Sequence, residues 1–337
     1  MSRSVTERRN QLAQIELENA LRAATRYAEN SRSPNTWRAY KSDWRIYETW
    51  CQSVDLESLP AEPETVAMFV AAQADKGLSP STLRRRLAAI QLVHFGAGHA
   101  SPHRAKQVTE VMRGIARKWG KPVQKKAPIL NENIKRMADS VEPETHKGLR
   151  DRALLLFGFA GAFRRSELVG INVENLKRRD EGLLVTIEKS KTDQESKGQL
   201  IAIPAKPASR YCPVQALDDW TTVAEIQTGA LFRRMFRGDV IGKQRLSAQS
   251  VALVVKEYAG RVGLDYAQFS GHSLRSGFIT SAAQNDANIL KMAEHSRHTS
   301  FDVLREYLQD ARKFEDNAGT RLFDELINVL DDEAHDS

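Results

Sequence analysis

One stretch of the sequence limits the fold more than any other. WGKPVQKKAPIL, at residues 119–130, contains one glycine, two prolines and three lysines, and it interrupts the helical periodicity on both sides. Glycine and proline break regular structure, and this composition is typical of a linker. We therefore predict two domains, at 34–118 and 129–337, joined by a linker at 119–128. A chain of 337 residues is long enough to give each domain its own core.

The first domain is predicted to be helical. Ser33-Pro34 is a helix-start signal, and Trp37, Tyr40, Trp44, Tyr47 and Trp50 then recur every three or four residues, as in an amphipathic helix. Three further helices are predicted at 63–76, in the run STLRRRLAAIQLVHFGAG behind the cap Ser79 and first-turn Pro80, and at 102–118. Residues 1–33 are polar and weakly periodic; they are predicted to be an N-terminal arm, either a loose helix or disordered, whose role stays open.

Positive charge is concentrated in the first third of the chain. Residues 1–126 contain 21 Lys and Arg against 12 Asp and Glu, and residues 79–126 contain 11 against one, Glu110. Such a basic block is suited to neutralising nucleic-acid phosphates, whereas a merely solvated helix face usually mixes both signs. Arg84, Arg85 and Arg86 are therefore predicted to bind DNA, pointing away from the apolar stripe of their helix.

The second domain is predicted to be mainly helical with one β-hairpin. GLLVTIEK and GQLIAIP are β-rich runs on either side of the polar segment SKTDQESK, which carries Lys191 at the hairpin tip. After Pro204 the periodicity is helical up to the acidic end, DDEAHDS. The predicted fold class is mainly α: a two-domain DNA clamp with a helical core-binding domain and a mostly helical catalytic domain.

Several common classes of protein are disfavoured by the sequence. It has no apolar run of about 18 residues and no apolar N-terminal stretch, so we expect neither a membrane span nor a secretory signal. Cys51 and Cys212 are far apart and are predicted to be buried, reduced thiols. GDVIGKQ lacks the spacing of a phosphate-binding loop, and the histidines match no zinc motif. We expect no metal and no other cofactor.

Four short segments of the second domain carry the candidate chemistry. GAFRRSELVGI places Arg164 and Glu167 three residues apart on a predicted helix, and SKTDQ carries Lys191. SGHSLRSG places His272 and Arg275 three apart, and RHTSFDVLREYL places His298 nine residues before Tyr307. Each has an ordinary structural interpretation, such as a surface ion pair or a core tyrosine. Their joint occurrence in this order favours one active site.

These segments resemble the signature of the tyrosine site-specific recombinases and integrases. In that family an arginine in a G-x-R-x-S-E-L setting precedes a hairpin lysine, H-x-x-R, a His or Trp, and a tyrosine nine residues later. Transfer by motif identifies the catalytic set: Arg164, Lys191, His272, Arg275, His298 and Tyr307. NTWRAYKSDWRIYETWC and KGLSPSTLRRRLAAI resemble helices of the family's Cre-like members, so the resemblance spans residues 34–323.

The chain departs from the family pattern at a few positions. Arg164 is followed by Arg165, where an apolar residue is usual; the Ser-Glu-Leu register selects Arg164, and Arg165 stays a rival. The residue nine before the tyrosine is His298, as in most of the family, whereas Cre-like members have tryptophan there. His295 lies twelve residues before Tyr307 and is interpreted as structural.

The resemblance implies cleavage and rejoining of DNA strands through a 3′-phosphotyrosyl intermediate. Two guanidiniums can hold the phosphate oxygens, imidazoles can donate hydrogen bonds or move the phenol's proton, and Lys191 can protonate the departing 5′ oxygen. Glu167 is expected to support Arg164. The protein–DNA bond conserves the bond energy, so neither ATP nor a metal is required.

The resemblance also implies the partners. We expect duplex DNA with inverted-repeat half-sites, a dimer on one site, a tetramer with a Holliday junction in the synapse, no membrane, and a cytoplasmic, nucleoid-associated location. The apolar stripe of RLFDELINVL is expected to bind a neighbouring copy, or else its own domain. Two other functions stay open: a type IB topoisomerase-like nicking and resealing enzyme, and a DNA-binding regulator with a relict site. The target sequence, the need for accessory proteins and the biological outcome of the exchange are not predicted.

Overall fold

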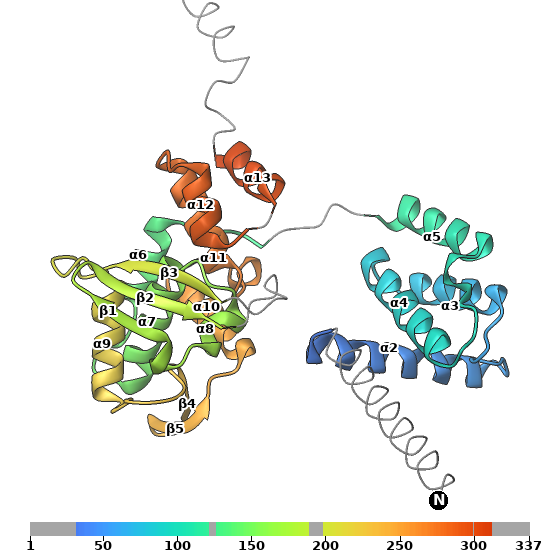
Figure 1. Cartoon of the computed structure of the whole chain (residues 1–337), viewed down its shortest axis with the longest axis horizontal. Coiled ribbons are helices and arrows are strands. Elements are labelled where there is room, and N and C mark those ends of the chain that lie inside the picture. Colours follow the sequence, from blue (N-terminus) through green and yellow to red (C-terminus); the bar gives the residue numbers. More distant parts are fainter. Residues whose placement is uncertain (1–31, 121–125, 189–197, 299, 312–337) are drawn as a thin grey trace, which may run out of the picture. The chain divides into compact units, whose positions relative to one another are not determined.

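The computed structural model describes residues 32–120, 126–188, 198–298 and 300–311. The chain divides into two compact units, Met1–Val123 and Gln124–Ser337, each of which is described by itself. Most of the described residues are helical, as predicted (Figure 1). Within these ranges no helix is both long and apolar enough to cross a membrane. The predicted N-terminal arm lies almost entirely outside the described residues, and the predicted linker does so in part.

The first unit is a bundle of helices around an aromatic core. Its elements are α2 (Pro34–Ser53), α3 (Pro63–Asp75), α4 (Pro80–Gly96), the 3₁₀ helix η1 (Pro102–Arg104) and α5 (Lys106–Trp119). Ser33 and Ser79 cap α2 and α4 by accepting a hydrogen bond from the backbone N–H three residues later, which confirms both predicted starts. Tyr47 and Phe69 pack edge to face in the core, with ring centroids 5.0 Å apart.

The second unit is built on α7 and a three-stranded sheet. Its elements are α6 (Asn131–Asp139), α7 (His146–Ala160), α8 (Arg165–Gly170), η2 (Val173–Asn175), β1 (Leu176–Arg179), β2 (Gly182–Ile187), β3 (Gln199–Pro204), α9 (Pro213–Val223), β4 (Arg233–Phe236), β5 (Val240–Arg245), α10 (Ala248–Arg261), η3 (Tyr266–Gln268), α11 (Ser273–Gln284), α12 (Ile289–Ser296) and α13 (Phe301–Ala311). The core includes the fully buried Trp220, whose indole N–H donates to the carbonyl of Leu231 at 2.9 Å. Cys51 and Cys212, one in each unit, are both buried and free, as predicted.

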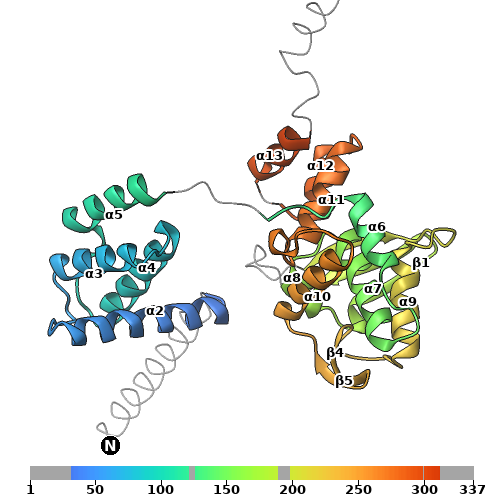
Figure 2. The same ribbon diagram turned by 180° about the vertical axis from the view of Figure 1, so that it is seen from behind.

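The sheet confirms the predicted hairpin strands and adds one more. β1, β2 and β3 are antiparallel in that order, with Val185 opposite both Leu176 and Ile201. The inward side chains of β2 and β3 alternate with exposed ones, so one face of the sheet packs onto the helical core (Figures 1 and 2). The hairpin tip that carries Lys191 lies outside the described residues.

The expectation of helices alone after Pro204 is wrong. β4 and β5 form a second antiparallel hairpin whose turn contains Gly238 and Asp239, both with positive φ. The run RRMF-RGD-VIGKQR has glycines and β-branched residues at the positions a hairpin needs, but the interspersed basic residues hide the alternation. Asp239 fixes this turn to the start of α7 by accepting the backbone N–H groups of His146 and Lys147.

A close approach of two segments positions α11, the helix that carries H-x-x-R. The chain entering the second unit runs beside this helix, and the backbone N–H of Ile129 donates to the carbonyl of Ser273 at 3.0 Å. A Cβ added to Gly277 would lie 1.9 Å from the carbonyl oxygen of Ile129, so a glycine is required there. The entering segment and α11 are therefore locked together next to the candidate site.

Candidate active site

The structure brings five of the six predicted catalytic residues to one region of the second unit. Arg164 lies at the start of α8, His272 and Arg275 at the start of α11, His298 just after α12, and Tyr307 in α13. Lys191, the sixth, lies outside the described residues. The helices α11, α12 and α13 pack on one another through a small apolar cluster that includes Ile279, Met292 and Leu304.

Arg164 is not on a helix with Glu167, and that expectation is wrong. It is the N-cap of α8, with extended backbone angles of φ −68° and ψ 146°. The side chain of Glu167 turns back to accept the backbone N–H of Arg164 at 3.0 Å and a hydrogen bond from Arg164 Nη1. Leaving the helix allows the arginine to extend away from it while the buried carboxylate holds both its backbone and its guanidinium. The expected support of Arg164 by Glu167 is thus seen in these contacts.

Arg275 is buried in the same cluster. Its side chain is 1% exposed, its Nη1 donates to the carbonyl of Ala162 at 2.8 Å, and its Nη2 lies 3.4 Å from both ring nitrogens of His298. Burial lowers the pKa of Arg275 to about 9, and repulsion from Arg164 and Arg297 adds to this, while Glu167 and the ionised phenol of Tyr307 oppose it. The tyrosine is therefore close enough to Arg275 to influence its charge.

The hydrogen bonds around His298 define which ring nitrogen carries the proton. Ser296 Oγ donates its hydrogen to the carbonyl of Met292 at 2.5 Å, and the same oxygen lies 2.8 Å from His298 Nδ1. A hydroxyl has one hydrogen, so Ser296 accepts from Nδ1–H, and the neutral ring keeps a lone pair on Nε2. Burial and the nearby guanidiniums of Arg275 and Arg164 lower the pKa of His298 to about 4. The ring is neutral at pH 7 and can accept a proton.

His272 lies against the same guanidiniums from the N-cap position of α11. Its residue surface is exposed, although protein atoms surround much of the ring. This partial desolvation, with repulsion from Arg275, Arg164 and Arg165, lowers the pKa of His272. Both candidate imidazoles are thus prepared as neutral groups in the protein without DNA.

Tyr307 lies on α13 and is half-buried. Its ring packs at the edge of the apolar cluster formed by α11, α12 and α13. The buried Leu304 anchors this helix, and the phenol lies close enough to Arg275 for their charges to interact. The nine residues that lead from His298 to Tyr307 are two connecting residues and the first seven residues of α13.

A sixth residue of the cluster, Arg297, was not predicted. Its side chain is 2% exposed and its Nη2 donates to Glu167 Oε2 at 2.9 Å. Arg297 has left-handed backbone angles, φ 58° and ψ 46°, directly before His298. No periodicity or motif in the sequence distinguishes this arginine from an exposed one, because its carboxylate partner is 130 residues away.

The charges of the cluster do not balance. Among its described residues, the three guanidiniums of Arg164, Arg275 and Arg297 face one carboxylate, which leaves an excess of positive charge. Burial by itself would raise the pKa of Glu167, but Arg297 and Arg164 lower it overall, so the carboxylate stays ionised. An unbalanced, partly buried cationic cluster is suited to an anion such as a phosphodiester, whose transition state carries additional negative charge.

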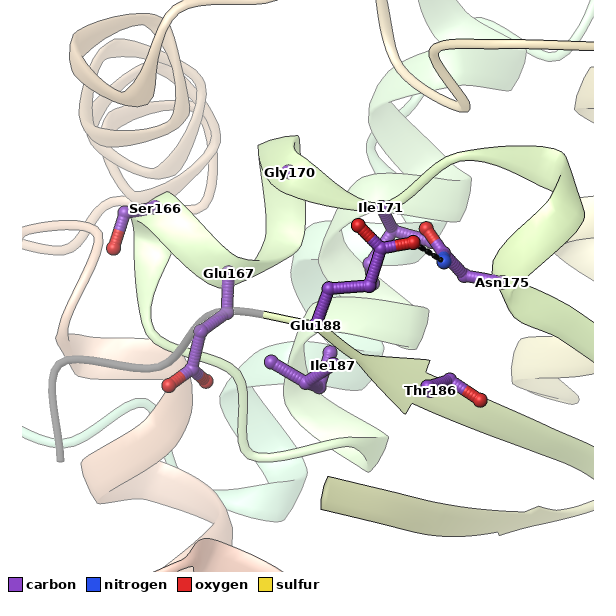
Figure 3. Close-up of a pocket in the computed structure, with 8 residues that line it drawn as sticks. All are labelled: Ser166, Glu167, Gly170, Ile171, Asn175, Thr186, Ile187 and Glu188. Carbon is purple, nitrogen blue, oxygen red and sulfur yellow. Dashed lines mark hydrogen bonds between the residues drawn. The ribbon is translucent and has the colours of Figure 1, made fainter. Parts of the chain in front are cut away.

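A small cavity of about 210 Å³ adjoins the cluster between α8 and the end of β2. Figure 3 shows Glu167 and Glu188 on its lining pointing to opposite sides, and Glu188 accepts a hydrogen bond from Asn175 Nδ2 at 2.7 Å. The end of β2 at Ile187 and the carboxylate that holds Arg164 therefore line the same cavity. His295 and Arg165, the two neighbours of the predicted site residues, lie in different environments. His295 Nε2 bonds to the carbonyl of Ala160 at 2.7 Å, in keeping with a structural role, whereas Arg165 is exposed.

The three arginines predicted to bind DNA do not share one environment. Arg84 is exposed, whereas Arg85 donates from Nε and Nη2 to both oxygens of the buried Asp43, at 2.7 and 3.0 Å. Arg86 is 8% exposed, bonds to Gln73 and lies over the ring of Phe69. The expectation that all three point away from the core is wrong for Arg86, because its helix turns that position towards α2 and α3.

Comparisons with known proteins cover nearly the whole chain. Residues 129–313 match the Phage integrase family, and residues 26–97 match the Phage integrase, N-terminal SAM-like domain. The chain is 41% identical to the integrase/recombinase xerD homolog of Selenomonas ruminantium, over 89% of each protein. It is 23% identical to the recombinase cre of Escherichia phage P1, over 82% of this chain and 84% of that protein.

Solved structures share the fold at low identity. The XerH site-specific recombinase bound to palindromic difH substrate, in a post-cleavage complex, matches with a TM-score of 0.58 and 17% identity, over 77% of this chain and 72% of that one. A lambda integrase dimer bound to a core site matches with a TM-score of 0.56 and 15% identity, over 86% and 93%.

Proposed function

This chain belongs to the phage integrase family, as its sequence predicted, and from that membership we propose how it cuts and rejoins DNA. The matches support a tyrosine recombinase that carries out site-specific recombination, with duplex DNA as its substrate. The observation that carries the proposal is the cationic cluster beside Tyr307. It has the charge, burial and hydrogen-bonding groups that an attack on a phosphodiester needs.

In the proposed reaction the Tyr307 oxygen attacks the scissile phosphorus. A Tyr–O–P bond forms and the bond from phosphorus to the 5′ oxygen breaks, which leaves a 3′-phosphotyrosyl link and a 5′ hydroxyl. Arg164 and Arg275 hold the non-bridging oxygens, because both retain positive charge at neutral pH and lie in the same cluster near Tyr307. Attack by a 5′ hydroxyl from a partner strand then reverses the step on new DNA.

The protons have proposed carriers. His298 is suited to accept the phenol's proton at Nε2, since Ser296 occupies its Nδ1–H. His272 is suited to donate to the phosphate once the bound anion raises the pKa of its ring. Lys191 is proposed to protonate the leaving 5′ oxygen, on the strength of the family motif alone. Arg84 and the exposed arginines of α5 are proposed to bind the DNA backbone.

The oligomer is a further part of the proposal: a dimer on inverted half-sites and a tetramer that exchanges strands through a Holliday junction. Residues 321–330, with the apolar stripe predicted to bind a neighbouring copy, lie outside the described residues. An apolar pocket of about 440 Å³, lined by Leu156, Phe159 and Phe278 among others, could receive such side chains from the same or another copy.

Truncation after Asn317 should leave binding to one half-site near normal and remove cooperative filling of a full site in a band-shift titration. Unchanged cooperativity would place the helix on its own domain.

The experiment that tests the function is incubation with supercoiled plasmids that carry inverted repeats from the genomic neighbourhood of the coding sequence. Exchange between two specific sites, together with a protein–DNA adduct that survives denaturation, is the expected result. Relaxation alone would favour a topoisomerase-like enzyme. Binding without an adduct would favour a DNA-binding regulator with a relict site.

A further inference from the structure

The two Nη groups of Arg297 have no hydrogen left to offer a phosphate. Its Nη1 donates to the carbonyls of Gly161 and His295 at 3.0 and 2.8 Å, and its Nη2 donates to the carbonyl of Ala162 and to Glu167, at 2.8 and 2.9 Å. Those are the four Nη hydrogens of a guanidinium, and the remaining Nε is buried without a partner among the described residues. Because protein acceptors already hold all four Nη hydrogens, Arg297 is not placed to bind a DNA phosphate.

The groups that Arg297 joins come from the two halves of the site. The carbonyls of Gly161 and Ala162 follow the end of α7 and lead directly into Arg164, while the carbonyl of His295 precedes His298. Arg164 Nη2 in turn donates to the backbone carbonyl of Arg297 at 3.3 Å. The two arginines are therefore connected twice, once through that carbonyl and once through the shared carboxylate of Glu167.

The same contacts reach Arg275. The carbonyl of Ala162 accepts from Arg275 Nη1 as well as from Arg297 Nη2, both at 2.8 Å. Ala162, like Arg297, has a positive φ, 45° against 58°, so each half of the site contains one backbone position that is unfavourable for a side chain. The guanidinium of Arg297 bridges the two turns, and such turns persist only where surrounding contacts hold them.

We propose that Arg297 is a positioning residue of the recombination reaction: it fixes the turn before Arg164 to the turn before His298, so that the phosphate-binding arginines face Tyr307. The inference rests on the proposed function. Losing the bridge should lower the rate of cleavage without weakening DNA binding, because a displacement of about 1 Å between catalytic groups can reduce a rate about 10²-fold.

Arg297→Gly is the most informative variant, since glycine adopts the left-handed backbone without strain and so removes the side chain without straining the turn. Arg297→Lys keeps the charge near Glu167 but cannot bridge four acceptors. Arg150→Lys is the matched control. Arg150 is a buried arginine, 5% exposed, that pairs with Asp151. It lies ten residues before the end of α7, which is about 15 Å along a helix that rises about 1.5 Å per residue.

The measurement is single-turnover formation of the covalent adduct on a nicked substrate, with half-site affinity and thermal unfolding followed in parallel. We expect adduct formation to fall about 10²-fold in Arg297→Gly and less in Arg297→Lys, with half-site Kd within about twofold of the parent. Arg150→Lys should lose stability and keep its cleavage rate. If Arg297→Gly does not fold, the Lys variant and its control carry the comparison.

A double-mutant cycle separates positioning from an independent contribution. If Arg297 acts through Arg164, Arg297→Gly should change the residual rate of Arg164→Ala by less than about threefold, because coupled residues are not additive. Three outcomes would overturn the positioning role of Arg297 and leave the proposed function standing. They are parent-like cleavage by Arg297→Gly, equal slowing by Arg150→Lys, and a full additive loss in the double variant. Absence of any adduct from the unmodified protein would overturn the proposed function and this inference with it.

Discussion

Arginines cluster in both units, but the two clusters differ in how fully the protein's own groups neutralise their charge. On α4, Arg85 and Arg86 both lie beside the buried Asp43, 2% exposed, and Arg86 also has Gln73 and the ring of Phe69 as partners. In the described part of the second unit, Glu167 pairs with Arg164 and Arg297, while Arg275 bonds to the carbonyl of Ala162 instead. The first arrangement stabilises a helix bundle, and the second retains positive charge for an anion. A run of arginines in a sequence therefore does not indicate which of them bind DNA; burial and partners do.

The histidines repeat the contrast. His94 in the first unit is fully buried, with Nδ1 on the carbonyl of Ile90 at 2.9 Å and Nε2 accepting the N–H of Ala61 at 2.9 Å. Both of its nitrogens are occupied by backbone, so it is a structural histidine. In His298 Nδ1 is fixed by Ser296, and among the described residues no backbone group bonds to Nε2, whose near neighbour is the guanidinium of Arg275 at 3.4 Å.

The largest expected effect comes from Tyr307→Phe, which divides the chemistry of the second unit from DNA binding. Without the phenolic oxygen no phosphotyrosyl bond can form, so the adduct should be abolished while half-site affinity is retained. A nicked substrate and a denaturing gel measure this. An adduct formed by the Phe variant would remove Tyr307 from its assigned role.

A smaller but still large effect should distinguish the two adjacent arginines. Arg164→Ala should slow adduct formation by about 10²–10³-fold, as the loss of one preorganised donor commonly does, and Arg165→Ala should be milder. The structure supplies the reason, since Glu167 holds Arg164 while Arg165 is exposed. Equal or reversed losses in single-turnover assays would show that the register selected the wrong residue.

Within the α4 run, the buried and exposed arginines should separate by type of effect. Arg86→Met should lower the free energy of unfolding by about 1–3 kcal/mol. The loss is limited because the buried carboxylate of Asp43 still pairs with Arg85 in this variant. Arg84→Ala should change stability by less than about 0.5 kcal/mol and reduce the slope of log affinity against log salt by about one unit. Denaturant titration and salt-dependent band shifts measure the two. A loss of stability in Arg84→Ala with an unchanged salt slope would contradict the division.

The last expected effect is confined to acidic conditions: a dependence of stability on pH. The pKa of His298 is about 4 in the folded protein, below the ordinary value of 6.5, so below pH 6.5 the unfolded chain binds a proton that the folded chain does not. Stability should therefore fall as the pH is lowered from about 6.5 towards 4. His298→Asn should flatten this part of the profile in denaturant titrations, and an identical slope for both proteins would contradict the lowered pKa.

The sequence by itself determined the family, the mainly helical class and the positions of the strongest local signals. Ser33 and Ser79 begin their helices and the β2–β3 strands lie where alternation predicted, because capping and alternation depend on neighbours within a few residues. The order and spacing of the motifs were sufficient to locate Arg164, His272, Arg275, His298 and Tyr307 in one region. The β4–β5 hairpin was missed because charged residues on its exposed face conceal its period.

Only the tertiary structure decided what each charged side chain does. It turned Arg86 into the core, placed Arg164 at a helix cap rather than on the helix, and paired Arg297 with a carboxylate 130 residues away. The physical reason is that the free energy of a charge depends on its burial and on its partners, which packing brings together from distant parts of the chain. Local sequence sets where a helix begins, whereas the identity of an arginine as support or as phosphate ligand follows from how the elements pack.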